Sequence, residues 1–484
     1  MRRAAVACGL ALAGCITTAG PDYEPPALEM PEAYTAPSGL PAGAAETALW
    51  WRGYGDSGLD DLVALALAGN LDIAAAEARL SEARALVGVA DAIGGPTLDI
   101  GSSIEAENVV RRERRSDRSG SSGIGTSSTS GSSDDETGLE GAAEAGLLFS
   151  WVPDLFGGQK RGIEAAEAEL RARTFLRDDL ARITAVEVVR RYLEIRRDEA
   201  RLDLIDASLG LQRHTLDLVE QRYQAGLASR LDVSRAEAQV AATQALRGPL
   251  RQDLARARAA LAVLSGRVPG APMLAPGDGM PQYRGGPPLG LPRDLLRARP
   301  DVRAAEAFLA QATAEIGVAE AELYPMLSIP GDLTWAISGL GSGEVIESLI
   351  ATLALGLDIP LFDAGGRRAE VAAAEARSQE ALLLYRGTLL NALADVEVAL
   401  ANLVAAQERR DDLQAAADAS DRAVAQAEQL YNQGLTGFLD VLDAQRTLLD
   451  NHQDLAEAEA AVSLGIADLY SAVGAPVTKA DVAR

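Results

Sequence analysis

The sequence predicts an α+β membrane protein that is built from two tandem copies of one unit. Three patterns predict it: a heptad stripe of apolar residues within residues 368–431, a Tyr-x-x-Gly-Leu motif that occurs twice, and four segments that alternate apolar with polar or small residues. The first pattern is typical of a long packed helix, and the last is typical of amphipathic strands. The recurrence indicates that each copy holds a helix, two strands, a long helix and a return helix. We expect the return helices at residues 232–264 and 440–473.

The long helix is predicted by spacing alone. From Leu382 to Tyr431, positions alternately three and four apart are apolar or Ala, apart from Arg410 and Ser420. No proline interrupts residues 368–431, so we expect one helix of about 64 residues, roughly 95 Å long at about 1.5 Å per residue. A stripe of this length requires partner helices along its whole course. The pattern therefore predicts a wall of helices.

The end of this helix has an earlier counterpart 208 residues before it. The matched residues are Tyr223, Gly226 and Leu227 in the first copy and Tyr431, Gly434 and Leu435 in the second. Further upstream, Asp72 matches Asp301 and Ile100 matches Ile329, at a separation of 229 residues. The first copy therefore holds 21 extra residues between Ile100 and Gly157.

Four segments change period from the helical spacing to an alternation of apolar with polar or small residues, at residues 98–106, 143–151, 327–337 and 351–359. Each is long enough to cross a membrane when tilted, and each has one apolar face. Four strands cannot close a barrel, and lipid does not tolerate open strand edges. We therefore expect a barrel that is shared between subunits.

Residues 1–14 combine a basic start, a short apolar stretch and small residues before Cys15. This pattern is typical of a secretory signal peptide, which is too short to span a bilayer permanently. The small residues resemble the bacterial lipobox, which implies cleavage before Cys15 and acylation of that cysteine, for example by palmitate; the alternative is an ordinary signal with a chance cysteine. Cys8 leaves with the signal, so we expect no disulfide. By resemblance to the lipoprotein sorting rule, Ile16 favours the outer membrane.

Composition divides the rest of the chain. We expect an acylated, extended N-terminal tail at 15–49, the first copy at 50–264, a linker and equatorial segment at 265–300, the second copy at 301–474 and a C-terminal tail at 475–484. Hinges join the strands to the long helices at Pro153, Gly157 and Gly158 and at Pro360, Gly365 and Gly366. Proline ends a strand ladder, and glycine lets the chain turn into a helix. A phosphate-binding loop would need Gly-Lys-Ser/Thr, which does not follow these glycines.

Charge and composition exclude several classes of function. The basic cluster at residues 111–115 is short, lacks interleaved aromatic residues and lies in a chain of net charge −25, so we expect no binding of nucleic acid. The cluster and the Ser/Gly-rich residues 116–138 predict a surface loop instead. His214 and His452 are not equivalent in the two copies and lack matching carboxylate spacing. The sequence therefore predicts no catalytic site, no metal site and no cofactor.

Together these features resemble the TolC-type outer-membrane efflux channel family, in its lipoprotein branch. The resemblance covers nearly the whole mature chain, including the Gly-Pro-Asp-Tyr tail, the Pro-x-Phe-Asp-Ala-Gly-Gly-Arg hinge and the Leu-Asp-Val-Leu-Asp-Ala-Gln segment after the second Gly-Leu elbow. It implies a homotrimer, with a twelve-stranded barrel in outer-membrane lipid and a helical barrel in the periplasm. It also implies a periplasmic adaptor protein and an inner-membrane pump, which we expect to be proton-driven.

The resemblance also implies site residues. The positions that match Asp440 and Asp443 line the periplasmic gate, those that match Tyr431 and Asp232 hold it closed, and the elbows Gly226-Leu227 and Gly434-Leu435 contact the adaptor. Asp440 and Asp443 are three residues apart on one helix face, so threefold symmetry would form two carboxylate rings. Asp440 alternatively caps the return helix, which is compatible with a ring. Thr436 replaces the arginine of the best-known relatives, so the closing ion pair is absent or is supplied by Arg230 or Arg235.

Two other functions remain open from the sequence. A type I protein secretion system uses an outer-membrane channel that looks the same, and the two systems differ in their pump. A non-pore, structural coiled-coil lipoprotein would explain the helices but not the alternating strands. The net charge of −25 suits a cation-preferring pore, although solvated helix faces would also account for much of it.

Overall fold

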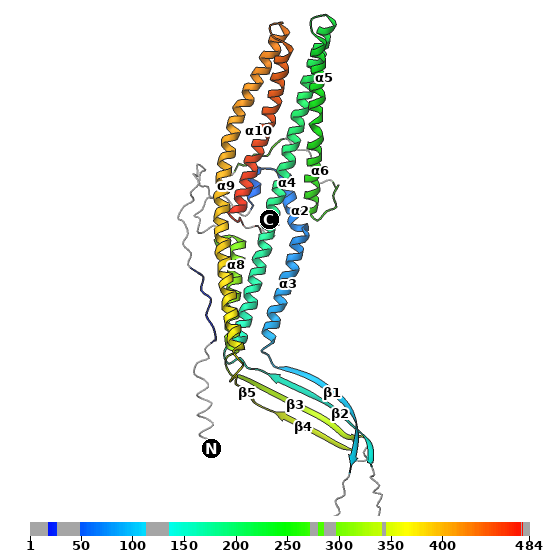
Figure 1. The fold of residues 1–484 in the computed structure, drawn as a ribbon, viewed down its shortest axis with the longest axis vertical. Coiled ribbons are helices and arrows are strands. Elements are labelled where there is room, and N and C mark those ends of the chain that lie inside the picture. Colours follow the sequence, from blue (N-terminus) through cyan, green and yellow to red (C-terminus); the bar gives the residue numbers. More distant parts are fainter. Residues whose placement is uncertain are drawn as a thin grey trace, which may run out of the picture. The chain divides into compact units, whose positions relative to one another are not determined.

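The computed structural model describes residues 18–26, 49–112, 135–271, 279–284, 297–340, 345–475 and 477. The predicted signal peptide, Cys15 and most of the tails lie outside the described residues, as does most of the Ser/Gly-rich segment 116–138. The described chain forms helices joined to strands in an order that repeats (Figure 1). The elements are η1 (Trp50–Tyr54), α2 (Ser57–Gly69), α3 (Leu71–Ala92), β1 (Thr97–Arg112), β2 (Asp135–Trp151), α4 (Gly158–Gln224), α5 (Arg230–Ala245), α6 (Arg247–Leu264), α8 (Pro300–Ala321), β3 (Met326–Leu340), β4 (Ile346–Leu353), β5 (Gly356–Asp358), α9 (Gly366–Asn432) and α10 (Phe438–Ala472).

These elements group into two compact units, and each unit draws on both copies. The strand unit comprises residues 1–22, 86–166 and 313–376. The helix unit comprises residues 23–85, 167–312 and 377–484.

The strand unit contains one antiparallel sheet in the order β1-β2-β3-β4, and β5 also pairs with β3. Leu98 lies opposite Phe149, and Leu327 lies opposite Leu357. The second pair is the image of the first under the separations of 229 and 208 residues. The two copies therefore share one strand register, which extends the duplication from sequence to backbone pairing.

The last strand differs from its prediction. It starts at Ile346, earlier than residue 351, and is interrupted between β4 and β5. The register does not change at this break, because the Ala354 N–H still donates to the Pro330 carbonyl at 2.9 Å. Pro330 has no N–H to return a second bond, so the ladder is weakened opposite it. The prediction was wrong at this boundary because the interrupting residue lies on the partner strand.

The predicted long helix is confirmed as α9, which has 67 residues. Its stripe is buried against neighbours in the helix unit, where Tyr385, Leu389 and Val396 cluster with Val302 of α8 and Leu469 of α10. By length and composition α9 could also cross a membrane. A stripe packed on two helices is instead what a coiled-coil wall requires.

The first return helix, predicted as one helix at residues 232–264, is two helices. α5 ends at Ala245, and α6 begins at Arg247. The cause is Pro249, whose ring clashes in a continuous helix with the carbonyl four residues earlier, on Ala245. The second return helix has no proline and continues for 35 residues as α10.

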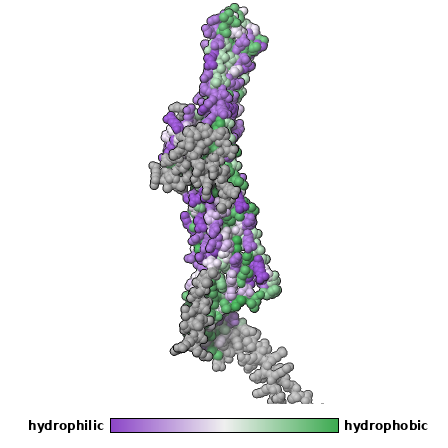
Figure 2. Space-filling model, turned by 90° about the vertical axis from the view of Figure 1, so that its left-hand side faces the viewer, coloured by the Kyte–Doolittle hydropathy of each residue, from purple (hydrophilic) through white to green (hydrophobic). Residues whose placement is uncertain are grey.

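An aromatic cluster joins distant parts of the helix unit. Trp50 stacks on Tyr470 with ring centroids 4.9 Å apart, and the hydroxyls of Tyr283 and Tyr470 lie 2.6 Å apart. Tyr283 belongs to the linker between the copies, so this cluster connects η1, the linker and α10. On the face shown in Figure 2, hydrophilic residues cover much of the helix unit, and hydrophobic ones are visible at its upper end.

Candidate gate and docking site at the helix elbows

The two elbows, where α4 turns into α5 and α9 turns into α10, have the same backbone. Gly226 and Gly434 adopt φ of +76° and +75°, a left-handed conformation that glycine adopts without strain. Leu227 N–H donates to the Arg222 carbonyl at 2.7 Å, and Leu435 N–H donates to the Leu430 carbonyl at 2.9 Å. Each elbow is therefore a Schellman motif.

The leucines after these glycines project from the elbows. In a Schellman motif this residue usually packs back on its own helix. Here Leu227 and Leu435 are 71% and 70% exposed. Each elbow thus presents an apolar side chain on a rigid, hydrogen-bonded turn.

The predicted gate carboxylates lie at the starts of the return helices. Asp232 accepts from the Ser229 N–H at 3.2 Å and from the Ser229 hydroxyl at 2.7 Å, as part of a capping box. Asp440 accepts from the Gly437 N–H at 3.2 Å and from the Thr436 hydroxyl. Asp440 therefore caps α10, as the alternative proposed from the sequence requires. Asp443 lies exposed on α10, three residues further on.

Arg222 links the two elbows. Its Nη1 donates to the Tyr431 carbonyl at 2.7 Å, and its guanidinium carbon lies 4.5 Å from the centroid of the Tyr431 ring. Tyr431 is buried beside Phe438, Val219 and other apolar residues from all four elbow helices. Burial raises the pKa of Tyr431, with Arg222 opposing the shift and Asp232 adding to it. Tyr431 therefore stays a neutral phenol at physiological pH.

Sequence reasoning missed Arg222. Arg230 and Arg235 are the arginines expected from the sequence to supply the closing ion pair. Arg235 lies near Asp232 of the same helix, with an N–O distance of 3.9 Å. Arg230 instead lies over Tyr223, at 5.9 Å from the ring centroid. The missed signal was the residue before the repeated tyrosine, which is Arg222 in the first copy and Leu430 in the second.

The turns that join strands to long helices in the strand unit contain two glycines and Ala364 with a left-handed backbone. Gly157 and Gly365 have φ of +78° and +90°, and Ala364 has φ of +57°. Asp363 caps α9 by accepting 2.9 Å hydrogen bonds from the N–H groups of Gly365 and Arg367. Hydrogen bonds from the Arg367 and Gly365 amides lower the pKa of Asp363, so it remains charged as a cap. Pro153, Gly158, Pro360 and Gly366 lie beside these turns.

The described start of the tail is held by Arg161 of α4. Arg161 donates to the Ala19 carbonyl at 3.0 Å, to the Gly20 carbonyl at 3.2 Å and to Asp22 at 2.7 Å. A Cβ on Gly20 would lie 2.4 Å from the Gly317 Cα, so the tail packs directly on the α8 backbone. The arrangement ties residues 18–22 to both copies within the strand unit.

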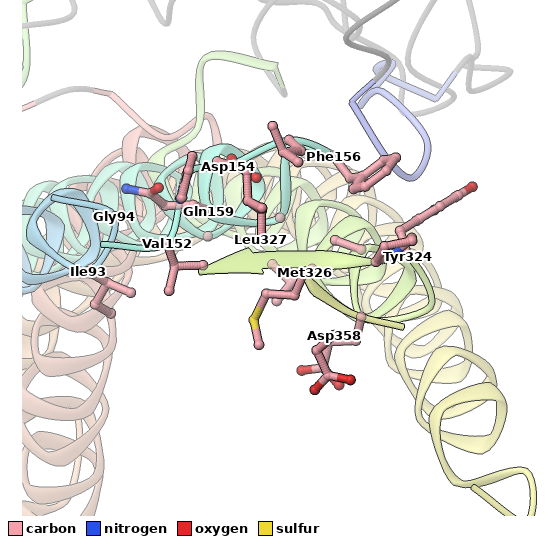
Figure 3. Close-up of a pocket in the computed structure, with 18 of the residues that line it drawn as sticks. Ile93, Gly94, Val152, Asp154, Phe156, Gln159, Tyr324, Met326, Leu327 and Asp358 are labelled. Atoms are coloured by element: carbon pink, nitrogen blue, oxygen red, sulfur yellow. The ribbon is translucent and has the colours of Figure 1, made fainter. Parts of the chain in front are cut away.

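A cavity of about 650 Å³ opens in the strand unit where strands meet helices. Apolar side chains such as Ile93, Val152 and Met326 lie around it, together with Asp154 and Asp358 (Figure 3). The three carboxylates of its lining, Asp154, Glu322 and Asp358, have no serine, threonine, cysteine, lysine or histidine beside them among the lining residues. Within the described part of the chain, no group of three or more His, Cys, Asp or Glu residues could hold a metal ion.

Comparison with known proteins identifies the family to which this architecture belongs. The family described as "Outer membrane efflux protein" matches residues 62–267 and 291–475. Nodulation protein T of Rhizobium leguminosarum bv. trifolii is 30% identical over 478 residues, which cover 97% of each chain. The pyoverdine export outer membrane protein OpmQ of Pseudomonas putida is 29% identical, covering 96% of this chain and 95% of OpmQ.

The solved structure of the outer-membrane channel OprN superposes with a TM-score of 0.80 at 30% identity. The match covers 95% of this chain and 99% of OprN. The helix-rich fold with a duplicated strand pair is thus the fold of outer-membrane channels. The family match spans most of the chain, and this protein belongs to the outer membrane efflux protein family as an outer-membrane channel.

Proposed function

We propose that three copies of this chain form one duct, which is the exit of a tripartite efflux system for small molecules. A twelve-stranded barrel would cross the outer membrane, and the helices would form a tunnel in the periplasm. A periplasmic adaptor would bind at the elbows, and a proton-driven inner-membrane pump would supply the energy. The relative OpmQ, named for export of pyoverdine, favours a small solute over a protein as cargo.

The observation that carries this proposal is the antiparallel sheet formed by β1 to β5. It exposes large apolar side chains, including Ile100, Ile104 and Leu349, and among the described strands β1 and β4 each pair on one side only. Exposed apolar strands suit lipid, and open edges do not, so the sheet requires further strands from other copies. A coiled-coil tether would need no such sheet.

The elbows suit an adaptor for a separate reason. Leu227 and Leu435 are exposed on rigid turns, and Leu231 and Leu439 add exposed apolar surface one turn further along. A preorganised apolar anchor contributes binding free energy with little loss of conformational entropy. Three copies would present six such elbows in a ring.

The gate is proposed at the same end. Asp440 and Asp443 are exposed on one face of α10, and the Arg222–Tyr431 link holds the α9–α10 hairpin against the α4–α5 hairpin. Three copies would place two carboxylate rings at the constriction, which would favour cations. Opening would require the two hairpins to separate at Arg222.

The lipid anchor is proposed at Cys15, three residues before Thr18. An extended chain spans at most about 3.5 Å per residue, so the four residues from Cys15 to Ala19, which Arg161 holds, would keep an acylated Cys15 within about 14 Å of Ala19. The tail would thereby keep the acyl chains near the strand unit.

The experiment is single-channel recording of the purified, detergent-extracted protein in planar bilayers. We expect stepwise conductance with cation preference, and we expect Asp440→Asn/Asp443→Asn to weaken that preference. Glu237→Gln, an exposed charge change on α5, is the matched control. Absence of conductance from verified trimers would contradict the duct. In cells, deletion of the gene should raise susceptibility to drugs or metals, whereas loss of protein export instead would favour a type I system.

A further inference from the structure

The cavity where strands meet helices opens on one face of the sheet. Opposite residues of an antiparallel ladder point to the same face, and successive residues of a strand alternate between faces. Met326 lies opposite Asp358, and Leu327 lies opposite Leu357. The two leucines therefore share one face, and Met326 and Asp358 share the other. In Figure 3, Val152 lies on the same side of the end of β3 as Met326 and Asp358.

The face that carries Met326 is the polar face of the sheet. On β3 it also carries Asp332, and on β1 and β2 it carries Ser103 and Glu144, where the Ser103 hydroxyl donates to the Glu144 carboxylate at 3.0 Å. The other face carries exposed apolar side chains such as Ile104. A barrel in lipid turns its apolar face outward and its polar face toward the lumen. In the proposed shared barrel, the cavity therefore opens into the lumen of the duct.

The walls of the cavity are largely apolar. Its volume of about 650 Å³ falls within the range of about 300–1,000 Å³ that is usual for small-molecule sites. The apolar lining comes from several strand–helix junctions and includes Ile93, Val152, Leu155, Val318 and Met326. Phe156 and Tyr324 also line the cavity, and their stacked rings have centroids 4.7 Å apart. Apolar groups of a ligand would leave water on entering such a cavity, which favours binding.

The charged groups of the lining favour a cation. They are three carboxylates and one guanidinium, at Asp154, Glu322, Asp358 and Arg367. The Arg367 guanidinium lies 3.6 Å from the carboxylate of Asp363, which is not part of the lining, so the positive charge is already offset. The three carboxylates of the lining are exposed. An excess of negative charge beside an apolar wall attracts a cation and repels an anion.

The fold of a strand–helix junction does not require these carboxylates. Under the separations of 208 and 229 residues, Asp154, Glu322 and Asp358 correspond to Phe362, Ile93 and Ser150. The two copies therefore make the same kind of junction with different charges at equivalent positions. Asp154 also accepts from the Lys160 N–H at 2.9 Å, near the start of α4, which gives it a structural role. Glu322 and Asp358 are therefore the carboxylates that matter for a ligand.

We propose that this cavity is a binding site for cargo within the duct, and that its ligand is a drug-sized amphipathic monovalent cation. The apolar groups of the cation would lie against Val152 and Met326, and its charge would lie near Glu322 and Asp358. The proposal rests on the proposed function and deepens it, because it names the class of cargo. A site inside a conducting pore must bind weakly enough to release its ligand, so we expect micromolar to millimolar affinity.

Two hydrophobic ions of similar shape and opposite charge test the site. Equilibrium dialysis of purified, detergent-extracted trimers against the same detergent measures how much tetraphenylphosphonium or tetraphenylborate the protein binds. Tetraphenylphosphonium should bind saturably, and tetraphenylborate should bind at least about tenfold more weakly, because the lining carries excess negative charge. Tetramethylammonium has the charge without the large apolar groups and should also bind more weakly.

Variants assign the binding to this cavity. Glu322→Gln/Asp358→Asn should weaken tetraphenylphosphonium binding about fivefold, as expected for two exposed charge contacts. Glu105→Gln/Asp332→Asn is the matched control, because it removes one glutamate and one aspartate from the same polar face outside the cavity. It should change binding by less than about twofold. Val152→Phe adds volume to the wall and should weaken binding of the cation without any change of charge.

The native mass of each variant shows whether it is still a trimer. Equal binding of the two hydrophobic ions would overturn the proposal, as would unchanged cation binding in both Val152→Phe and Glu322→Gln/Asp358→Asn. Trimers that conduct in bilayers but bind no tetraphenylphosphonium would also overturn the site and leave the duct intact. Verified trimers without conductance would instead contradict the duct itself.

Discussion

The two elbows have the same backbone turn and opposite side-chain surroundings. Tyr431 of the second elbow is buried beneath Arg222, whereas its counterpart Tyr223 in the first elbow is 41% exposed. Phe438 is buried, and its counterpart Arg230 is exposed. The two copies therefore keep the same backbone turn, and their side chains have diverged. The first elbow supplies Arg222, whose guanidinium contacts the second elbow. The second elbow supplies Tyr431, which Arg222 contacts, and Phe438, which is buried beside it.

The largest effect is expected at Phe438, the aromatic member of the duplicated pair Arg230 and Phe438. Phe438→Ala removes a buried ring from the elbow cluster and should lower the free energy of local opening by about 3–5 kcal/mol. Arg230→Ala, at the duplicated position, should change it by less than about 0.5 kcal/mol. Hydrogen exchange of the elbow amides in the assembled protein measures both. Equal losses of protection would contradict the asymmetry.

The next largest effect is expected at Arg222, which links the two elbows. Arg222→Ala removes the charged donor from the Tyr431 carbonyl, which keeps the Gly434 N–H at 2.9 Å. The loss of a hydrogen bond from a charged group should cost about 1.5–3 kcal/mol. We expect a higher open probability in bilayers, because the hairpins lose their link. Arg222→Lys keeps the charge but not the planar fork and should restore only part of the closure. Leu430→Ala occupies the duplicated position and serves as the control; an equal gain in opening from it would argue against a specific link.

A third difference lies before α3 and α8, where the copies carry Asn70 and Arg299. Asn70 caps α3, whereas Arg299 forms a two-point ion pair with Asp301, at 2.7 and 3.0 Å. Burial alone would raise the pKa of Asp301, but the hydrogen bonds and charge of Arg299 lower it overall. This carboxylate therefore contributes stability above about pH 4, the range of an unfolded aspartate, which is lost as pH falls through its lower folded pKa. Thermal midpoints below pH 4 should fall less steeply for Asp301→Asn than for the natural chain, and parallel curves would contradict this assignment.

The smallest effect is expected at the helix caps. Ser229 caps α5 with its hydroxyl, whereas the matching residue of the second elbow is Gly437, which has no side chain. Ser229→Ala should destabilise its elbow by about 1 kcal/mol. Gly437→Ser should stabilise the other by a few tenths, roughly the difference between glycine and serine caps. A Cβ at Gly437 meets only the Asp440 carboxylate at 3.9 Å, so the change fits. Lower hydrogen-exchange protection of the elbow amides in Gly437→Ser would show that Thr436 and Asp440 already satisfy the start of α10.

Local pattern was sufficient where one segment decides its own structure. The spacing of Leu389, Val396 and Leu403 predicted a helix that the structure continues for 67 residues, and Gly226 and Gly434 predicted turns that need a left-handed backbone. Prediction failed where the deciding group acts on another position. Pro249 ended α5 four residues upstream, and Pro330 interrupted the strand opposite it. Arg222 was missed because its partner, Tyr431, is 209 residues away and only packing brings them together.

By itself the sequence determined the duplication, the helical stripe, the alternating strands and the turn chemistry, because each depends on residues a few positions apart. Tertiary structure decided which copies of a motif are covered. Leu147 and Leu355 share a pattern, yet one meets β3 and the other faces an open edge. Tyr431 and Tyr223 share a motif, yet one is buried and the other is not. Burial depends on what lies beside a residue in space, and a repeated pattern cannot encode that difference.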